Sequence, residues 1–544
     1  MLEANVITAT NPQAEPAETA RRPALFWRLV PWVLIVLGTA SVALTQRGIG
    51  FTWDEAYYYV PSKMAGEWVA EIFRGNHPFD AATIDKYWEP RHEHPSVGRL
   101  LSGVALQLFP GQRPYLAMRL PMALLFGFTL ALILLIGRRC WSNRAGLFAA
   151  ILYAMLPRVF GHEHFATLEP PLLFMTMLVV YCFLRGLDSP VWAAITGVAW
   201  GVLLATKING FFLPVPLVLW AHLYARPRYV NNLFSMVTLG PIAMVASWPW
   251  LWHDTAKRLL NYLMFHTEHQ KISVFFMGLM WGDQHTAPWF YPAVIIGVSV
   301  PLTILLVFVI GFARSVAAPR RRPFEALCLF CILVMMGVAS VPGIPKYDGE
   351  RLFLTVFPFL ALLGGAAIGS ALDQIGKPAM ARLAAAGAAL VLLADGGVAI
   401  GRYHPYLLSY FNPIVGGLPG AAGRFEATYW GEALNDDLIR AINHLPDGST
   451  LKGVAFNDGT MMLLQEWGLI KPTITIGGAA RGTYFDYHLV QNRRGMFSRI
   501  ERTLVDTDMF PMVYAQRKMG VPLMMIYKTG PQFEQAWRKM KFEE

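Results

Sequence analysis

Long apolar runs alternate with short polar stretches over most of the chain. About eleven of these runs reach roughly 20 residues each, the length that crosses the hydrocarbon core of a bilayer as a helix. We therefore expect an α-helical polytopic membrane protein with about eleven transmembrane helices. The cores of these runs begin near Leu29, Pro114, Ala145, Pro170, Val191, Phe211, Asn232, Phe290, Phe324, Leu352 and Met380.

The pattern changes at both ends of this series. Residues 1–23 are polar and rich in Pro and Ala, which predicts a disordered tail, and residues 24–401 form the transmembrane module. Residues 402–544 are polar again. They contain one amphipathic helical stretch, NDDLIRAINHL, and two alternating, strand-like stretches, STLKGVAF and MVYAQRKMGVPLMMIYKTG. We expect a small α/β domain there.

Charged loops predict the orientation. If the helix count is right, the basic clusters all fall on one side, which the positive-inside rule makes cytoplasmic. The N-terminus is then cytoplasmic and the C-terminal domain lies on the outer face. These clusters comprise Arg21, Arg22, Arg28, Arg138, Arg139, Arg144, Arg185, Arg226, Arg228, Arg314, Arg320 to Arg322, Lys377 and Arg382.

Composition agrees with a membrane protein. Only 15% of the 544 residues are charged, against about 25% in soluble chains. The net charge of +10 is explained by the loop arginines, so topology accounts for it better than nucleic-acid binding does. None of the four cysteines falls in a predicted outer loop, and no disulfide framework is implied.

The predicted outer loop at residues 46–113 contains the richest polar chemistry. The stretch from Phe51 to Arg99, nearly fifty residues of mixed polar and aromatic chain, cannot lie in hydrocarbon, where unpaired backbone groups are costly. The adjacent carboxylates Asp54 and Glu55 stand near its start. We interpret this loop as part of a polar active site at the membrane surface.

Other predicted outer loops add matching groups. Glu169, Lys207 and Arg351 fall on the same side as Asp54 and His94. Glycosyl transfer to an alcohol needs a carboxylate base and cations that hold a departing phosphate, and both kinds are present. Each residue also has a simpler explanation.

The simpler explanations are structural. Asp54 fits a helix N-cap about as well as a base. Lys207 at the end of a run could reach the interface by snorkelling, and Arg351 could pair within its own loop, which contains Asp348. A transporter would place charges inside its helices near the midplane, where these runs have few. A lipid or sugar transporter, or a flippase, remains the alternative function.

Two histidine clusters raise the question of a metal. His92 and His94 flank Glu93, and His162 and His164 flank another carboxylate. Two His and one carboxylate can form a metal site, although solvated histidines are the commoner outcome. We expect that no cofactor is required, and the histidine pairs leave a divalent cation as an alternative.

These motifs resemble the GT-C glycosyltransferases, especially the protein O-mannosyltransferases and the bacterial aminoarabinose transferase of lipid A. The resemblance covers roughly residues 24–401. The carried-over motifs are Asp54 and Glu55 in WDEAYY, His94-Pro95-Ser96, Leu168-Glu169-Pro170, Thr206-Lys207, and Arg351 in DGER. Ser96 stands where the family has a second Pro, and Glu169 where it has Asp.

The resemblance implies a function and a set of roles. Such enzymes move a hexosyl or pentosyl group from a polyprenyl-phosphate donor to a hydroxyl of a protein, lipid or glycan, on the outer face of a bacterial inner membrane. It implies catalytic roles for Asp54, Glu55 and Glu169, and donor-phosphate binding by His94, Lys207 and Arg351. We expect a further set of residues to contact the acceptor, the sugar or a metal: His92, Glu93, His162, His164 and Asp348.

Overall fold

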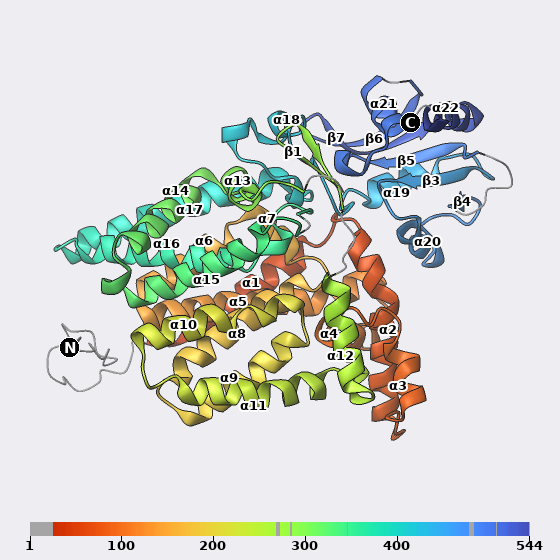
Figure 1. Cartoon of the computed structure of the whole chain (residues 1–544). Helices are drawn as coiled ribbons and strands as arrows, with labels where there is room; N and C mark the ends of the chain where they lie inside the picture. The colour runs from red at the N-terminus through yellow and green to blue at the C-terminus, as the bar shows by residue number, and fades with distance from the viewer. Residues whose placement is uncertain are drawn as a thin grey trace.

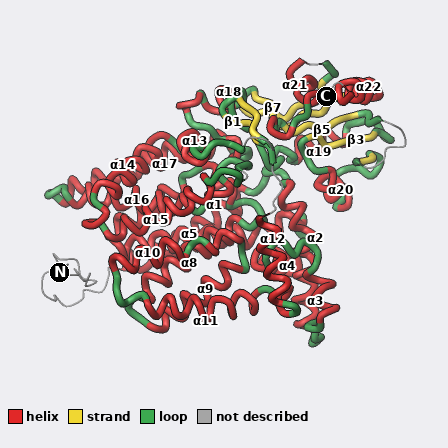
Figure 2. Tube along the Cα trace, viewed as in Figure 1, coloured by secondary structure: helices red, strands yellow, loops and turns green. Residues whose placement is uncertain are grey.

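The computed structural model describes residues 25–267, 272–282, 286–344, 346–477, 484–507 and 509–542. The tail predicted for residues 1–23 lies outside these ranges. Within them the chain is mainly helical, with strands concentrated near the C-terminus (Figure 2).

Seven described helices are long and apolar enough to cross a membrane, which confirms an integral membrane protein. They are α1 (Leu25–Thr45), α5 (Pro114–Cys140), α8 (Glu169–Gly186), α11 (Val230–Ser247), α15 (Pro323–Ser340), α16 (Val356–Asp373) and α17 (Pro378–Tyr403). The count of eleven spans stays a prediction.

Shorter helices occupy the remaining apolar runs. They are α6 (Asn143–Ala154), α7 (Pro157–His162), α9 (Pro190–Leu204), α10 (Pro214–Tyr224), α13 (Tyr291–Ser299) and α14 (Leu302–Ala317). Proline divides several of these runs because it lacks the N–H that continues a helix and disfavours helical geometry in the residue before it. Pro157, for example, separates α6 from α7, and Pro301 separates α13 from α14.

The predicted outer loop is mostly helical. It forms α2 (Trp53–Phe73), α3 (Ala81–Trp88) and α4 (Ser96–Leu108). α2 and α4 approach closely where Gly66 faces Gly103, since a Cβ on either glycine would overlap the other helix's backbone. Trp68 and Trp88 lie in an apolar cluster with the segment Trp248–Trp252, and α12 (Thr255–Thr267) covers it. These contacts fix the orientation of α2.

The C-terminal part contains a five-stranded sheet in the order β4-β3-β5-β7-β6. β3 is parallel to β4 and β5, whereas β5, β7 and β6 are antiparallel neighbours. The strands are β3 (Thr450–Val454), β4 (Thr475–Ile476), β5 (Tyr487–Gln491), β6 (Met512–Lys518) and β7 (Val521–Lys528), and a separate hairpin joins β1 (Val274–Phe276) to β2 (Leu279–Trp281).

Helices cover both faces of this sheet. Leu489 belongs to the apolar cluster that includes α19 (Asp436–Asn443) and α20 (Asp458–Glu466), whereas Val490 packs with α21 (Arg499–Thr507) and α22 (Gly530–Phe542). The region sits beside α2 and the ends of the membrane helices (Figure 1). The predicted helix is present as α19, and the predicted hairpin turns at Met519-Gly520, one residue before the predicted Gly-Val-Pro turn.

Candidate active site

The start of α2 sets the positions of two neighbouring carboxylates. Thr52 is the N-cap, and its hydroxyl accepts a hydrogen bond from the backbone N–H of Glu55 (3.4 Å). Glu55 completes a capping box by accepting from the backbone N–H of Thr52 (3.1 Å). The N-cap alternative for Asp54 is therefore wrong, because Thr52 fills that position and leaves the Asp54 side chain free to point elsewhere.

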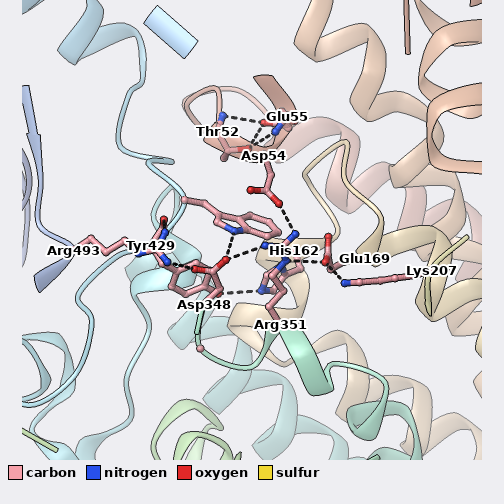
Figure 3. Close-up of polar contacts among 12 residues, drawn as sticks. Thr52, Asp54, Glu55, His162, Glu169, Lys207, Asp348, Arg351, Tyr429 and Arg493 are labelled. Atoms are coloured by element: carbon pink, nitrogen blue, oxygen red, sulfur yellow. Dashed lines mark hydrogen bonds and ion pairs between the residues drawn. The ribbon is translucent and has the colours of Figure 1, made fainter. Parts of the chain in front are cut away.

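Arg351 gathers three carboxylates from three segments of the chain (Figure 3). Its guanidinium donates to Glu169 (2.9 Å) at the start of α8, to Asp348 (2.9 Å) in its own loop, and to Asp54 in α2. Lys207, which follows α9, donates to the same Glu169 oxygen (2.6 Å). The structure thus brings together Asp54, Glu169, Lys207, Asp348 and Arg351, all of which the sequence singled out.

The C-terminal region reaches this cluster. Arg493, just after β5, donates to Asp348 (2.7 Å) and to the backbone carbonyl of Tyr429 (3.0 Å). The indole N–H of Trp430 also donates to Asp348 (3.1 Å), and its ring lies against the Arg351 guanidinium (4.9 Å). Asp348 therefore links Arg351 to the sheet region.

Asp54 has a perturbed acidity. Burial raises the pKa of Asp54 to about 6, with Asp348 and Glu169 adding to the rise and Arg351 opposing it. The side chain is 18% exposed, so solvent or a substrate can reach it. A carboxylate with this pKa is largely ionised at pH 7 and can accept a proton.

His94 borders the cluster without a polar contact to it. Its ring packs edge-on against Tyr58 (5.0 Å between ring centres). Burial lowers the pKa of His94 to about 3, helped by the positive charge of Arg351. The imidazole is therefore neutral, and it can contact a phosphate only as a neutral hydrogen-bond donor.

Glu55 lies apart from the cluster in a buried pair with Arg119 of α5. Both carboxylate oxygens contact Arg119 (2.6 Å each), and the backbone N–H of Ala166 donates to one of them (3.0 Å). Arg119 also donates to the carbonyls of Ile49 and Gly50. Both side chains are fully buried. This arrangement points to a structural role and gives no support to the catalytic role predicted for Glu55.

The two predicted histidine clusters do not converge. His162 is buried beside Tyr429, whose hydroxyl is 3.0 Å from its Nε2, and burial lowers the pKa of His162 to about 3. His164 instead contacts the hydroxyl of Thr45 (2.8 Å) in α1. Of His162 and His164, His162 is the one near the Arg351 cluster.

His92 and Glu93 contact residues outside the Arg351 cluster. His92 stacks on Trp250 (4.5 Å between ring centres), and Glu93 is 3.7 Å from Arg91. Among the described residues, no group of three or more His, Cys, Asp or Glu side chains is arranged to hold a metal ion. The geometry of these histidines is that of packed side chains.

A cavity of about 680 Å³ lies between α2, the segment 89–93 and α20, and none of the five cluster residues is part of its wall. Tyr57, one turn after Asp54 and on the same face of α2, is part of its wall. The guanidinium of Arg91 stacks on the Tyr57 ring (3.6 Å). The polar part of the lining comes from Tyr57, Glu89, Arg91, His92, Glu93 and Asn457.

Sequence reasoning missed three residues that shape the site. Arg119 stands inside an apolar run, and Arg493 and Trp430 lie in the C-terminal region, far along the chain. A charge isolated in an apolar run was a usable signal for Arg119, because such a charge needs a buried partner. No local pattern marked Arg493, since its role depends on the tertiary contact with Asp348.

Comparisons with known proteins identify a shared fold. A family model described as dolichyl-phosphate-mannose-protein mannosyltransferase matches residues 100–263, less than a third of the chain. The crystal structure of apo ArnT from Cupriavidus metallidurans shares the fold, with a TM-score of 0.52 at 17% identity, over 93% of this chain and 99% of that one. At this identity the likeness shows a shared fold, and it is the fold that the GT-C resemblance of the motifs predicted.

Proteins that match by sequence include two named glycosyltransferases. An undecaprenyl phosphate-alpha-4-amino-4-deoxy-L-arabinose arabinosyl transferase 2 of Pseudomonas fluorescens is 26% identical over 360 residues, covering 63% of this chain and 56% of that protein. Transferase 1 of the same organism is 28% identical over 298 residues, covering 52% and 49%. The chain thus spans about half the length of these curated relatives.

Proposed function

We propose that this protein is a membrane glycosyltransferase that moves a sugar from a polyprenyl-phosphate donor to an acceptor hydroxyl. One observation carries the proposal: Arg351 and Lys207 lie within hydrogen-bond distance of Glu169, and Arg351 also holds the partly exposed Asp54. A base and two cations in one accessible cluster are what transfer from a lipid phosphate requires.

The cations are assigned to the donor phosphate. Arg351 and Lys207 are each 13% exposed, so an incoming phosphate can reach both. Glu169 pairs with both cations and keeps them at fixed positions before the donor arrives. The negative charge that develops on the leaving phosphate is then stabilised by groups already in place, which is where electrostatic catalysis is most effective.

Asp54 is assigned as the base. Its carboxylate takes the proton of the acceptor hydroxyl while that oxygen forms a bond to the anomeric carbon. The bond from the anomeric carbon to the phosphate oxygen breaks at the same time, and polyprenyl phosphate leaves with the bonding electrons. Attack opposite to the leaving group inverts the anomeric configuration. No residue in this scheme needs a nucleotide or a metal.

The cavity beside α2 is assigned to the acceptor. It opens next to Tyr57 and combines carboxylates, an arginine and aromatic rings, groups suited to a hydroxyl-rich or peptide acceptor. This assignment gives His92 and Glu93 a place in acceptor binding. His94 is assigned to the donor side, as a neutral neighbour of the phosphate.

The finer topology is also part of this proposal. We place the chain in a bacterial inner membrane with about eleven spans, the N-terminus cytoplasmic, and residues 402–544 as an α/β domain on the outer face. The names of the sequence relatives, which include undecaprenyl phosphate, support a donor of that kind. An aminoarabinose donor and a lipid acceptor are the first candidates.

The test uses the purified full chain with a panel of polyprenyl-phosphate sugars carrying radiolabelled sugar, each offered with protein, lipid and glycan acceptors. We expect label to enter one acceptor class with release of polyprenyl phosphate. Passage of intact donor across vesicles without covalent transfer would instead establish the transporter alternative.

A further inference from the structure

A second polar cavity lies at the other end of the helices from the candidate site. α8 begins at Glu169 in the site, and Leu184 and Leu187 near its end line this second cavity. An α-helix rises 1.5 Å per residue, so the two places are about 25 Å apart. The cavity encloses about 730 Å³ between the ends of α5, α8, α10 and α16 and the start of α15.

Arginines dominate the polar lining of this cavity. Two of them share one carboxylate, since Arg139 and Arg228 both pair with Asp188. Five arginines in total line the cavity: Arg139, Arg228, Arg314, Arg321 and Arg322.

The nearby acidic groups do not balance these arginines. Glu325 is 3.9 Å from Arg314 and 3.8 Å from Arg322, too far for good hydrogen bonds. Asp373 pairs with Arg144 instead (3.1 Å). Arg321 makes no ion pair with any described residue. The cavity therefore has an excess of positive charge.

One buried donor is left without a partner. The Nε of Arg314 is inaccessible to solvent and has no hydrogen-bond partner among the residues that the structure describes. A buried unsatisfied donor costs free energy, more so when it belongs to a charged group. The positive-inside rule explains why arginines stand on this side, but it does not explain a cavity into which they converge or an unsatisfied Nε there.

The remaining wall is apolar. Trp141, Leu184, Leu187, Trp220 and Phe324 face the same cavity, and α5, α8, α15 and α16 are all candidate membrane spans. A soluble anion would gain nothing from this apolar wall. A lipid would use both parts, with its phosphate on the arginines and its glycerol and upper acyl chains on the aromatic side chains.

We infer that this cavity binds the phosphate of an anionic phospholipid at the membrane end opposite the candidate active site. The site is independent of the proposed reaction. Arg321 pairs with no described carboxylate, and Arg314 has only the loose 3.9 Å approach of Glu325. The Trp141 and Trp220 rings hold the part of the lipid next to the headgroup. Phosphate chemistry alone would also suit a soluble phosphate ester, so the experiment separates the two sources.

The experiment measures binding to the delipidated full chain in detergent, by native mass spectrometry and by thermal unfolding. The probes are dioleoyl phosphatidylglycerol, dioleoyl phosphatidylcholine with the same chains, and sn-glycerol 3-phosphate. We expect phosphatidylglycerol to stay bound and to raise the Tm, phosphatidylcholine to bind at least tenfold more weakly, and glycerol 3-phosphate to have no effect at the same concentration.

Variants locate the binding. Arg314→Gln combined with Arg321→Gln should weaken phosphatidylglycerol binding roughly tenfold or more, because two charge-assisted contacts are lost. Arg321→Gln alone, at an exposed position that cannot disturb folding, should give part of this loss. Arg382→Gln removes an exposed charge in the first turn of α17 that does not line the cavity, and it should leave binding unchanged.

Three results would overturn the inference. Unchanged phosphatidylglycerol binding in the Arg314 and Arg321 variants would remove the site. An equal loss in Arg382→Gln would show general surface attraction only. An equal Tm shift with glycerol 3-phosphate would replace the lipid with a soluble phosphate ligand.

Discussion

Two arginine–carboxylate groups meet at the start of α2, one through Glu55 and the other through its neighbour Asp54, and they differ in burial and in how their hydrogen bonds are shared. Arg119 and Glu55 are fully buried, and both carboxylate oxygens are bonded. Arg351 instead spreads its donors over Asp54, Glu169 and Asp348, and it remains partly exposed. A buried group whose hydrogen bonds are all made stabilises the fold, whereas a partly exposed group can exchange partners with a substrate.

The difference is visible in how each group is assembled. Arg119 also binds the carbonyls of Ile49 and Gly50, so it fixes the backbone that leads into α2. The Arg351 cluster instead collects side chains from separate segments, with Arg493 contributed by the C-terminal region. The first group therefore positions α2, and α2 in turn presents Asp54 to the second.

The largest expected effect is that of Asp54→Asn on the proposed transfer. Removal of a general base costs roughly 10²–10⁴-fold in kcat, and asparagine keeps the size of the side chain. The Tm should remain close to wild type because Asp54 is partly exposed. Steady-state transfer and thermal unfolding on the same preparation measure both. Wild-type kcat in this variant would remove Asp54 as the base.

Glu55→Ala should lower the Tm and leave kcat largely unchanged, the opposite of the effect expected for Asp54→Asn. Loss of one partner leaves Arg119 buried and unpaired, which costs about 3–5 kcal/mol in the free energy of unfolding. The Tm should fall clearly, while the folded fraction retains transfer activity at low temperature. If Glu55→Ala kept its Tm and lost kcat, the structural and catalytic assignments of the two neighbours would have to be exchanged.

Arg493→Gln tests whether the sheet region supports the site. Asp348 would lose a charged partner at 2.7 Å and hold Arg351 less firmly, so we expect roughly a tenfold loss in kcat/KM, about 1.4 kcal/mol. Arg494→Gln is the matched control, because Arg494 pairs with Asp506 within the C-terminal region. Equal losses in both variants would indicate general disturbance of the C-terminal region.

The pH dependence should be smaller. The pKa of Asp54 is raised to about 6, and a base works only when deprotonated, so kcat/KM should fall as the pH drops below about 6, nearing tenfold per pH unit. Above pH 7 this group should cause no further change. A pH profile of kcat/KM shows the acidic limb, and a limb near pH 4 would mean that Asp54 is not the titrating base.

Metal removal should have the smallest effect. The described histidines and carboxylates do not converge on a metal site, so dialysis against EDTA should leave the transfer rate within experimental error. A loss restored by Mg²⁺ or Mn²⁺, and not by Na⁺, would contradict this expectation.

Much of this arrangement could be predicted from the sequence. The apolar runs located the helices, and Asp54, Glu169, Lys207 and Arg351 were placed on one side by loop charges. The T-x-x-E spacing from Thr52 to Glu55 is a capping-box pattern, so the capping contact of Glu55 could also have been predicted from the sequence. The contact of His164 with Thr45 in α1 could not be predicted, because it depends on tertiary packing.

The most direct test of the central claim is a single turnover with prebound, labelled polyprenyl-phosphate sugar in wild type, Arg351→Ala and Arg351→Lys. The claim is that Arg351 stabilises the departing phosphate. Loss of that contact should raise the activation free energy by about 3 kcal/mol and slow polyprenyl-phosphate release roughly 10²-fold. The Arg351→Lys variant should recover part of the rate. Equal release rates in wild type and Arg351→Ala would contradict the account.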